Sequence, residues 1–461
     1  MDFESIDQLM FYSRRIIGKS LNDIITENEF FSDNHSMKTT KGILGNLVET
    51  EFYHYPNNNE AKADFENLGV ELKTTGIVKN TKGIRAKERL VLSMINYMDI
   101  VNETFDDSHL MEKNNLILIL WYCYQKDVDF KDFKFITLLL YSLERDRDVI
   151  ENDFNIIKNK VIQGKAHELS EGDTTYLGAC TKGKDSHETR SQPFSDIPAR
   201  SRAFCLKNSY MTLLLNELMD ETPKKRSNNS RYLSVIDYVN DKLKPYFGMT
   251  QFEIAQEIGL NIDYNKPPKN LNKQISDKII GKDKDLKELD EIFKYSNYVI
   301  KNSPILKDIG FKERMFFRNM SLSDFDVDWE DSDWKHYFED VCIINILYEF
   351  DRKNAKVGER RLKEVKTITF TSEDIDSMEV TFNMIKNAID CYNNKELNGT
   401  LDDYVKLLPT PGSFENQILE IGPRASKGKN SYYTLFENDK DKTNVAFALN
   451  KPFLNKKLEL Y

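Results

Sequence analysis

Three residues that could hydrolyse a phosphodiester, Asp64, Glu71 and Lys73, lie close together in the sequence. Hydrolysis of this bond needs an activated water, neutralised phosphate charge and a stabilised leaving oxygen, and carboxylate oxygens that hold Mg²⁺ supply much of this. Asp64 and Glu71 are therefore predicted ligands of Mg²⁺. Glu49, which ends the stretch GILGNLVE, is a third acid that could ligate the metal directly or through water.

The spacing of Glu71 and Lys73 suits a shared role, because the stretch GVELKTTGIV at residues 69–78 has the pattern of a strand. Residues two apart on a strand project from the same face, so both side chains can reach one phosphate. Lys73 would then orient or help to deprotonate the attacking water and stabilise the developing charge. By itself, an acid followed by Glu-x-Lys also fits an exposed strand whose ion pair contributes little.

The wider context of these acids resembles a known family. The stretch KGILGNLVE, followed by Asp-x4-GVELKT, is similar to the mismatch-repair endonuclease MutH, with a helix glutamate, an aspartate and the strand Glu-x-Lys in the same order. The resemblance implies that the catalytic residues are Glu49, Asp64, Glu71 and Lys73. Lys113, just before the apolar stretch LILILW, either matches a further active-site lysine of that family or is an ordinary lysine that leads into the next strand.

Two later stretches, KAHELSEGDTTYLGACTKG and ARSRAFCLKNSYMTLLL, resemble tandem MutH-type restriction endonucleases that cut at GATC. The resemblance implies a DNA-reading loop at residues 176–184 and a second DNA-contacting segment at residues 200–210. Basic side chains suit phosphate and guanine contacts. The predicted DNA-binding residues of this half are Lys182, Lys184, Arg190, Arg202 and Lys207. Arg190 and Arg202 fit ordinary surface positions equally well.

Helical and strand-like patterns alternate along the chain, which favours an α/β or α+β fold over a bundle or a sandwich. The stretch LILILWYCY, from Leu116, is apolar enough for a central strand buried on both faces, and residues 151–165 have the pattern of a helix. The resemblance implies the restriction-endonuclease-like (PD-(D/E)XK, MutH-type) fold, a mixed central sheet flanked by helices.

The second half of the chain repeats features of the first. The triplet KER occurs at residues 87–89 and again at 312–314, and FNIIKN at 154–159 corresponds to FNMIKN at 382–387. Because the matches come in the same order, they indicate an internal duplication. The polar stretch ETPKKRSNNSR between the halves is typical of a linker.

The second half has lost part of the catalytic pattern. The repeat places Val299 where Glu71 stands in the first half, and no aspartate aligns with Asp64, although Asp290 lies close to the aligned position. The stretches EIGPRASKGKN and AFALNKPFLNKK still resemble the DNA-reading loop and closing segment of the family. The predicted DNA-binding residues here are Arg424, Lys427 and Lys429. We therefore expect this half to bind a second DNA site as an allosteric effector.

A length of 461 residues exceeds what one core usually organises. We predict a catalytic domain at residues 1–222 and a degenerate effector domain at 235–461. The net charge of −10 argues against a general nucleic-acid coat, but local basic clusters leave site-specific binding open. No segment has the pattern of a membrane span or a signal peptide, and five scattered cysteines lack zinc-site spacing. We expect a bacterial cytoplasmic protein with reduced thiols and no membrane partner.

With the resemblance, these patterns predict a type II restriction endonuclease that hydrolyses double-stranded DNA with Mg²⁺ and leaves 5′-phosphate ends. The short site, GATC, rests on the resemblance alone. The expected partners are double-stranded DNA, a second DNA site, a second chain recruited on DNA and, functionally, a cognate methyltransferase. Two alternatives stay open, a nicking endonuclease of the mismatch-repair kind and a catalytically inactive DNA-binding protein of the same fold.

Overall fold

A computed structural model describes residues 3–24, 40–55, 62–80, 83–182, 188–220, 232–281, 297–351, 356–397, 399–424, 430–437 and 441–460. The chain divides into two compact units. The first unit comprises Met1–Leu169 and Asp173–Leu233, and the second comprises Ser170–Gly172 and Ser234–Tyr461. No helix in the described ranges has the length and apolarity that crossing a membrane requires.

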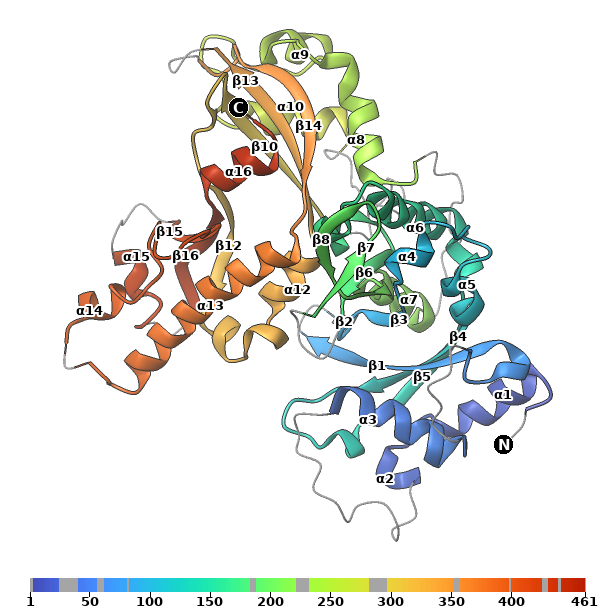
Figure 1. The fold of residues 1–461 in the computed structure, drawn as a ribbon. Helices are drawn as coiled ribbons and strands as arrows, with labels where there is room; N and C mark the ends of the chain where they lie inside the picture. The colour runs from blue at the N-terminus through green and yellow to red at the C-terminus, as the bar shows by residue number, and fades with distance from the viewer. Residues whose placement is uncertain are drawn as a thin grey trace. The chain divides into compact units, whose positions relative to one another are not determined.

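The first unit contains a mixed four-stranded sheet with the strand order β2-β1-β4-β5 (Figure 1). β1 runs parallel to β4, whereas the β1–β2 and β4–β5 pairs are antiparallel. The strands are β1 (Val70–Asn80), β2 (Gly83–Ala86), β4 (Leu116–Cys123) and β5 (Phe135–Ser142). β4 is central and largely buried, and β1 contains most of the strand predicted at residues 69–78, so both strand predictions are confirmed.

The two faces of this sheet have different roles. Val70 and Leu72 belong to a hydrophobic cluster that includes residues of β4, β5 and the N-terminal helices. These helices are α1 (Ile6–Ser13), α2 (Leu21–Ile24) and α3 (Thr40–Leu47). Because side chains alternate along a strand, Glu71 and Lys73 project from the opposite face. The sheet therefore separates this apolar cluster from the predicted catalytic side chains.

A three-stranded antiparallel sheet with the order β3-β9-β6 and a hairpin of β7 and β8 complete the strands of the first unit. The strands are β3 (Leu90–Met94), β6 (Leu177–Thr181), β7 (Thr189–Gln192), β8 (Ser195–Arg200) and β9 (Arg202–Leu206). The accompanying helices are α4 (Tyr97–Ile100), α5 (His109–Asn114), α6 (Arg147–Ile162) and α7 (Asn208–Met219).

The helix predicted at residues 151–165 is α6, but it begins and ends earlier than the pattern suggested. A 3-10 turn over Leu143–Asp146 leads directly into its first residue. Gly164, shortly after its last residue, has a φ of 70°, the left-handed conformation that commonly ends helices. Within α6 the buried carboxylate of Asp153 accepts backbone N–H bonds from residues 175–177, which ties the helix to the start of β6.

The second unit repeats this architecture. Its four-stranded sheet has the order β11-β10-β13-β14, with β10 parallel to β13 and the other two pairs antiparallel. Its three-stranded sheet has the order β12-β16-β15. The strands are β10 (Tyr298–Leu306), β11 (Gly310–Phe311), β12 (Met315–Ser321), β13 (Cys342–Phe350), β14 (Arg361–Ile368), β15 (Leu419–Pro423) and β16 (Lys442–Leu449). The matching orders and directions identify the sequence repeat as a duplication of the fold.

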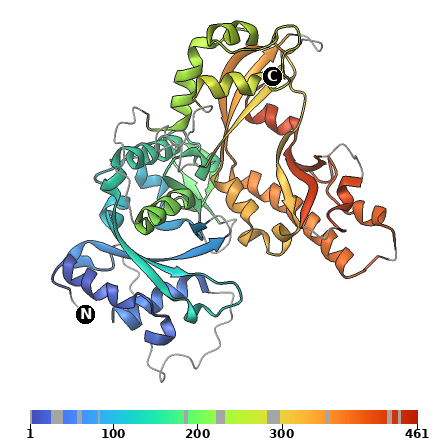
Figure 2. The same cartoon turned by 180° about the vertical axis from the view of Figure 1, so that it is seen from behind.

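Helices accompany both sheets of the second unit, and α13 lies beside the β12-β16-β15 sheet in Figure 1 and Figure 2. The first of these helices are α8 (Val235–Leu243), α9 (Gln251–Glu257), α10 (Leu271–Ile279) and α12 (Asp333–Asp340). The later ones are α13 (Ser372–Asn393), α14 (Leu401–Val405), α15 (Asn430–Tyr433) and α16 (Lys451–Lys457).

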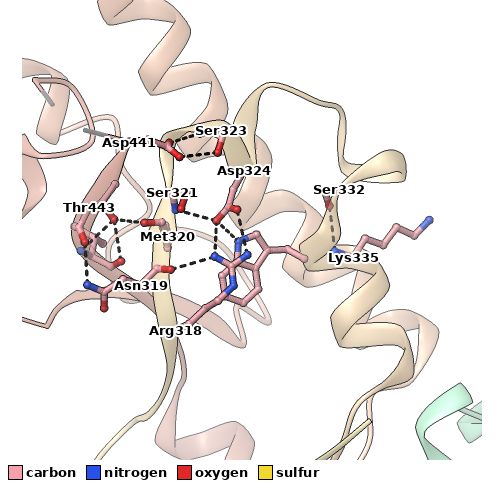
Figure 3. A network of polar contacts seen from close by, with 12 residues as sticks. Arg318, Asn319, Met320, Ser321, Ser323, Asp324, Ser332, Lys335, Asp441 and Thr443 are labelled. Carbon is pink, nitrogen blue, oxygen red and sulfur yellow. Dashed lines mark hydrogen bonds and ion pairs between the residues drawn. The ribbon is translucent and has the colours of Figure 1, made fainter. Parts of the chain in front are cut away.

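A polar network ties β12 to α12 within the second unit (Figure 3). Asp324, in the turn after β12, accepts hydrogen bonds from the guanidinium of Arg318 at 3.1 Å and from the indole N–H of Trp334 at 2.8 Å. The guanidinium carbon of Arg318 lies 4.3 Å from the centre of the Trp334 ring. The charge of Arg318 is therefore balanced inside the unit.

Candidate active site

A tight turn before β1 places the first predicted ligand. Phe65 and Val70 exchange backbone hydrogen bonds, and Gly69 between them has a left-handed φ of 64°. The turn brings Asp64 back beside the strand, where its Oδ2 accepts the backbone N–H of Leu72 at 2.8 Å. The aspartate is thereby fixed against the same stretch of strand that carries the Glu-x-Lys pattern.

Glu71 is the centre of the group, and its side chain is only 2% exposed. Its Oε1 pairs with the ammonium of Lys73 on the same strand, and Nζ of Lys113 lies 3.7 Å from that oxygen. Lys113 stands in the last turn of α5, just before β4. Burial raises the pKa of Glu71, and the positive charges of the two lysines oppose this.

The other carboxylate oxygen of Glu71 is in a different situation. Oε2 is buried and has no hydrogen-bond partner among the residues that the structure describes. A buried carboxylate oxygen without a partner lowers stability, because it has left water without compensation. A cation at this oxygen would remove that cost.

Glu49 lies in the π-helical turn Val48–Phe52 that follows α3. Burial is the main reason that the pKa of Glu49 is raised to about 7, and the negative charge of Asp64 is the next. Glu71 raises this pKa further, and Lys73 and Lys113 lower it. The structure therefore brings all five predicted catalytic side chains within electrostatic reach of one another.

The donor atoms of this group fit a divalent cation. Its three carboxylates offer the hard oxygen ligands that Mg²⁺ prefers, and crowded carboxylates favour a bound cation over mutual repulsion. The buried Oε2 of Glu71 is an oxygen that no hydrogen-bond donor among the described residues occupies. Among all the residues that the structure describes, however, no three Asp, Glu, His or Cys side chains are already close enough together to hold a metal ion.

Two predicted DNA-binding residues of the first unit lie at the surface. Lys182 directly follows β6 and is exposed, and its backbone N–H donates to the carbonyl of Ser201 at 2.8 Å. Arg190 on β7 has a side chain that is 49% exposed and lies 3.7 Å from the carboxylate of Glu188. Three further predicted residues, Lys184, Lys427 and Lys429, lie outside the described residues.

Arg202 and Lys207 are not at the surface, contrary to the prediction of direct DNA contact. Arg202 is 4% exposed, and its guanidinium donates to the carbonyls of Ala179 and Leu169. Lys207 is 2% exposed, and its Nζ donates to the carbonyl of Thr174 at 2.8 Å. Both side chains are anchored in the interior because backbone carbonyls of distant segments surround them, which the linear pattern does not reveal.

The second unit holds equivalents of several of these positions. Glu71 and Val299 are both the second residue of their strand and both pair with the second residue of the parallel neighbour. Arg424 follows β15 as Lys182 follows β6, and its backbone N–H donates to the carbonyl of Asn444 at 2.9 Å in the same way. Asp290, the nearest aspartate to the counterpart of Asp64, lies outside the described residues.

Two cations near Arg424 were not predicted as binding residues. Lys301 on β10 is within electrostatic reach of Arg424, and Arg314, which precedes β12, lies over the same Phe316 ring as Arg424. The internal repeat could have identified both residues from the sequence, because Lys301 aligns with Lys73 and Arg314 belongs to the second KER triplet.

Comparison with known proteins gives three matches. Residues 53–153 match the family described as DNA mismatch repair enzyme MutH, a range that includes every predicted catalytic residue except Glu49. The chain is 30% identical over 386 residues to the type II restriction enzyme Sau3AI of Staphylococcus aureus, covering 79% of this chain and 76% of that protein. It is 31% identical over 126 residues to the DNA mismatch repair protein MutH of Shewanella woodyi, covering 27% of this chain and 52% of that protein.

Proposed function

The chain belongs to the family of MutH-related type II restriction enzymes, and from that premise we propose that it is a Mg²⁺-dependent, site-specific deoxyribonuclease. It hydrolyses both strands of DNA at GATC and leaves 5′-phosphate ends. The observation that carries the proposal is the convergence of Glu49, Asp64, Glu71, Lys73 and Lys113 in the first unit.

Each side chain has a role that follows from its surroundings. Asp64 and Glu71 would hold Mg²⁺, with Glu49 as a further ligand, directly or through water, and a metal there would supply charge neutralisation at the phosphate and acidify the attacking water. Lys73, held beside Glu71 on one strand face, orients the attacking water and stabilises the developing negative charge. Lys113 approaches the same carboxylate from α5 and helps to fix it.

The proposal is tested by sequencing the ends of plasmid DNA digested with Mg²⁺ and by comparing Glu71→Gln with Glu66→Gln. Glu66 is a matched control because it is an exposed acid that pairs with Lys62 just before β1. We expect Glu71→Gln to bind DNA without cutting it and Glu66→Gln to cut normally. Normal cutting by Glu71→Gln would reject the site, whereas ends at another sequence would reject only GATC. Cuts confined to one strand would favour a nicking enzyme.

The second unit acts as an allosteric effector that binds a second copy of the site. Val299 stands where the first unit has Glu71, which supports binding without cutting. Arg424 keeps the position of Lys182 beside the equivalent strand, which supports retained DNA contact. Plasmids with one and two GATC sites test this role, and the two-site plasmid should be cut faster at equal site concentration. Equal rates would reject the effector role and leave the nuclease assignment standing.

A further inference from the structure

We propose that the former catalytic centre of the second unit is a metal-independent phosphate-binding cluster in which Lys301 and Arg424 contact DNA beside Phe316. The inference deepens the proposed effector function and rests on it. Two cations would bind the phosphates directly at this site, without a metal ion.

The position of Lys301 follows from the duplicated sheet. Lys73 is the fourth residue of β1 and pairs with Ile119 of β4, and Lys301 is the fourth residue of β10 and pairs with Asn345 of β13. In the first unit the carboxylate of Glu71 balances the lysine. With valine at the glutamate position, Lys301 keeps its place in the sheet but not that partner.

Lys301 is partly buried and faces another cation. Its Nζ donates to the backbone carbonyl of Phe316 at 3.0 Å and has no carboxylate partner among the described residues. Burial lowers the pKa of Lys301, and the positive charge of Arg424 lowers it further. A partly buried cation that is repelled by its neighbour is destabilising unless an anion compensates it, so this arrangement favours a bound anion.

Phe316 and Arg314 complete the cluster. The guanidinium carbons of Arg314 and Arg424 lie 5.1 Å and 5.5 Å from the centre of the Phe316 ring. Arg314 is held by the carboxylate of Glu420 at 3.1 Å and by the carbonyl of Ile421 at 3.2 Å, so it is a positioning residue.

Arg424 is exposed, and its guanidinium has no carboxylate partner within the described ranges. The three cations Lys301, Arg314 and Arg424 and the one acid Glu420 leave two positive charges. Two uncompensated positive charges can bind two neighbouring phosphates, because the negative charges of the DNA backbone are closely spaced.

Two other cations of the second unit, Arg318 and Lys386, are compensated by carboxylates and so differ from Lys301. Arg318, on β12 after Phe316, is neutralised by Asp324 (Figure 3). Lys386 on α13 resembles Lys301 because it donates to a backbone carbonyl, that of Val327, at 2.9 Å, but it also pairs with Asp328 at 2.9 Å. Lys386 is therefore a matched control for Lys301.

The test uses the full chain in EDTA, so that DNA is bound and not cut. Titration calorimetry with a short duplex that contains GATC should give two duplexes per wild-type chain and one for the double variant Lys301→Met and Arg424→Met. Lys386→Met should still bind two. In the single variants Lys301→Met and Arg424→Met, loss of one phosphate contact should reduce the slope of log affinity against log salt concentration at the weaker-binding class of site by about 0.9.

Thermal unfolding separates loss of binding from loss of folding. Without DNA, Lys301→Met should melt no lower than the wild type because it removes an uncompensated charge, whereas Lys386→Met should melt lower. Two duplexes bound by the double variant with wild-type affinity would overturn the cluster and leave the effector proposal intact. A single duplex per wild-type chain would instead overturn the effector proposal itself.

Discussion

Nζ of Lys113, in the last turn of α5, lies 3.7 Å from Oε1 of Glu71 on β1, the oxygen that also pairs with Lys73. Two lysines thus converge on one carboxylate oxygen and leave Oε2 without a hydrogen-bond partner in the described residues. The two oxygens of Glu71 therefore have different surroundings, one cationic and one suited to a metal ion.

Replacing Lys113 by Met tests whether this convergence matters for cutting. We expect single-turnover cleavage to slow by about 10- to 100-fold, because a carboxylate that is less firmly placed disturbs the reacting geometry. DNA affinity should change little. Lys62→Met is the control, since Lys62 is an exposed lysine paired with Glu66. Wild-type rates in Lys113→Met would identify Lys113 as an ordinary lysine at a helix end.

Mg²⁺ should stabilise the folded protein through Glu71. A ligand that binds only the folded state at 100 times its Kd contributes about 2.7 kcal/mol, so Mg²⁺ should raise the melting temperature of the wild type. In Glu71→Gln the rise should disappear or shrink, because the carboxylate whose Oε2 has no hydrogen-bond partner among the described residues is gone. Glu66→Gln should respond as the wild type does. An equal rise in Glu71→Gln would place the stabilising ion elsewhere.

Lys182 and Lys207 should respond differently to substitution. Lys182→Ala should weaken DNA binding and lower the salt-dependence slope by about 0.9 without changing stability, because Lys182 is exposed. Lys207→Met should reduce the free energy of unfolding by about 1 to 3 kcal/mol, because it deprives the buried carbonyl of Thr174 of its donor. DNA binding measured over a series of salt concentrations checks the first effect, and urea unfolding checks the second. If Lys207→Met instead weakened DNA binding and left stability unchanged, Lys207 would be a DNA contact after all.

The stability of the wild type should depend on alkaline pH through Lys301. Its pKa is lower in the folded protein than in the unfolded chain, so between these two values the unfolded chain binds more protons. The free energy of unfolding should therefore rise with pH in that window and level off above the unfolded value. Lys301→Met should lack this contribution when both proteins are unfolded in urea across the same pH series. If the free energies of unfolding of the wild type and Lys301→Met changed with pH in parallel, the pKa of Lys301 would be the same in the folded and unfolded states.

The sequence alone determined the parts of the site that lie within one element or follow from the duplication. The Glu-x-Lys spacing of Glu71 and Lys73 defined a strand face, and the repeat located the loss of the glutamate at Val299. Both inferences hold because strand alternation and repeat register are local properties of the chain.

Only the tertiary structure decided which distant groups meet. It brought Lys113 from α5 onto Glu71, enclosed Arg202 and Lys207 among backbone carbonyls, and set Lys301 beside Arg424. These outcomes depend on how helices and sheets pack over long sequence separations. The sequence does not distinguish a basic residue that is exposed to DNA from one that donates to a buried carbonyl. Only the packing of the folded chain decides which of the two it is.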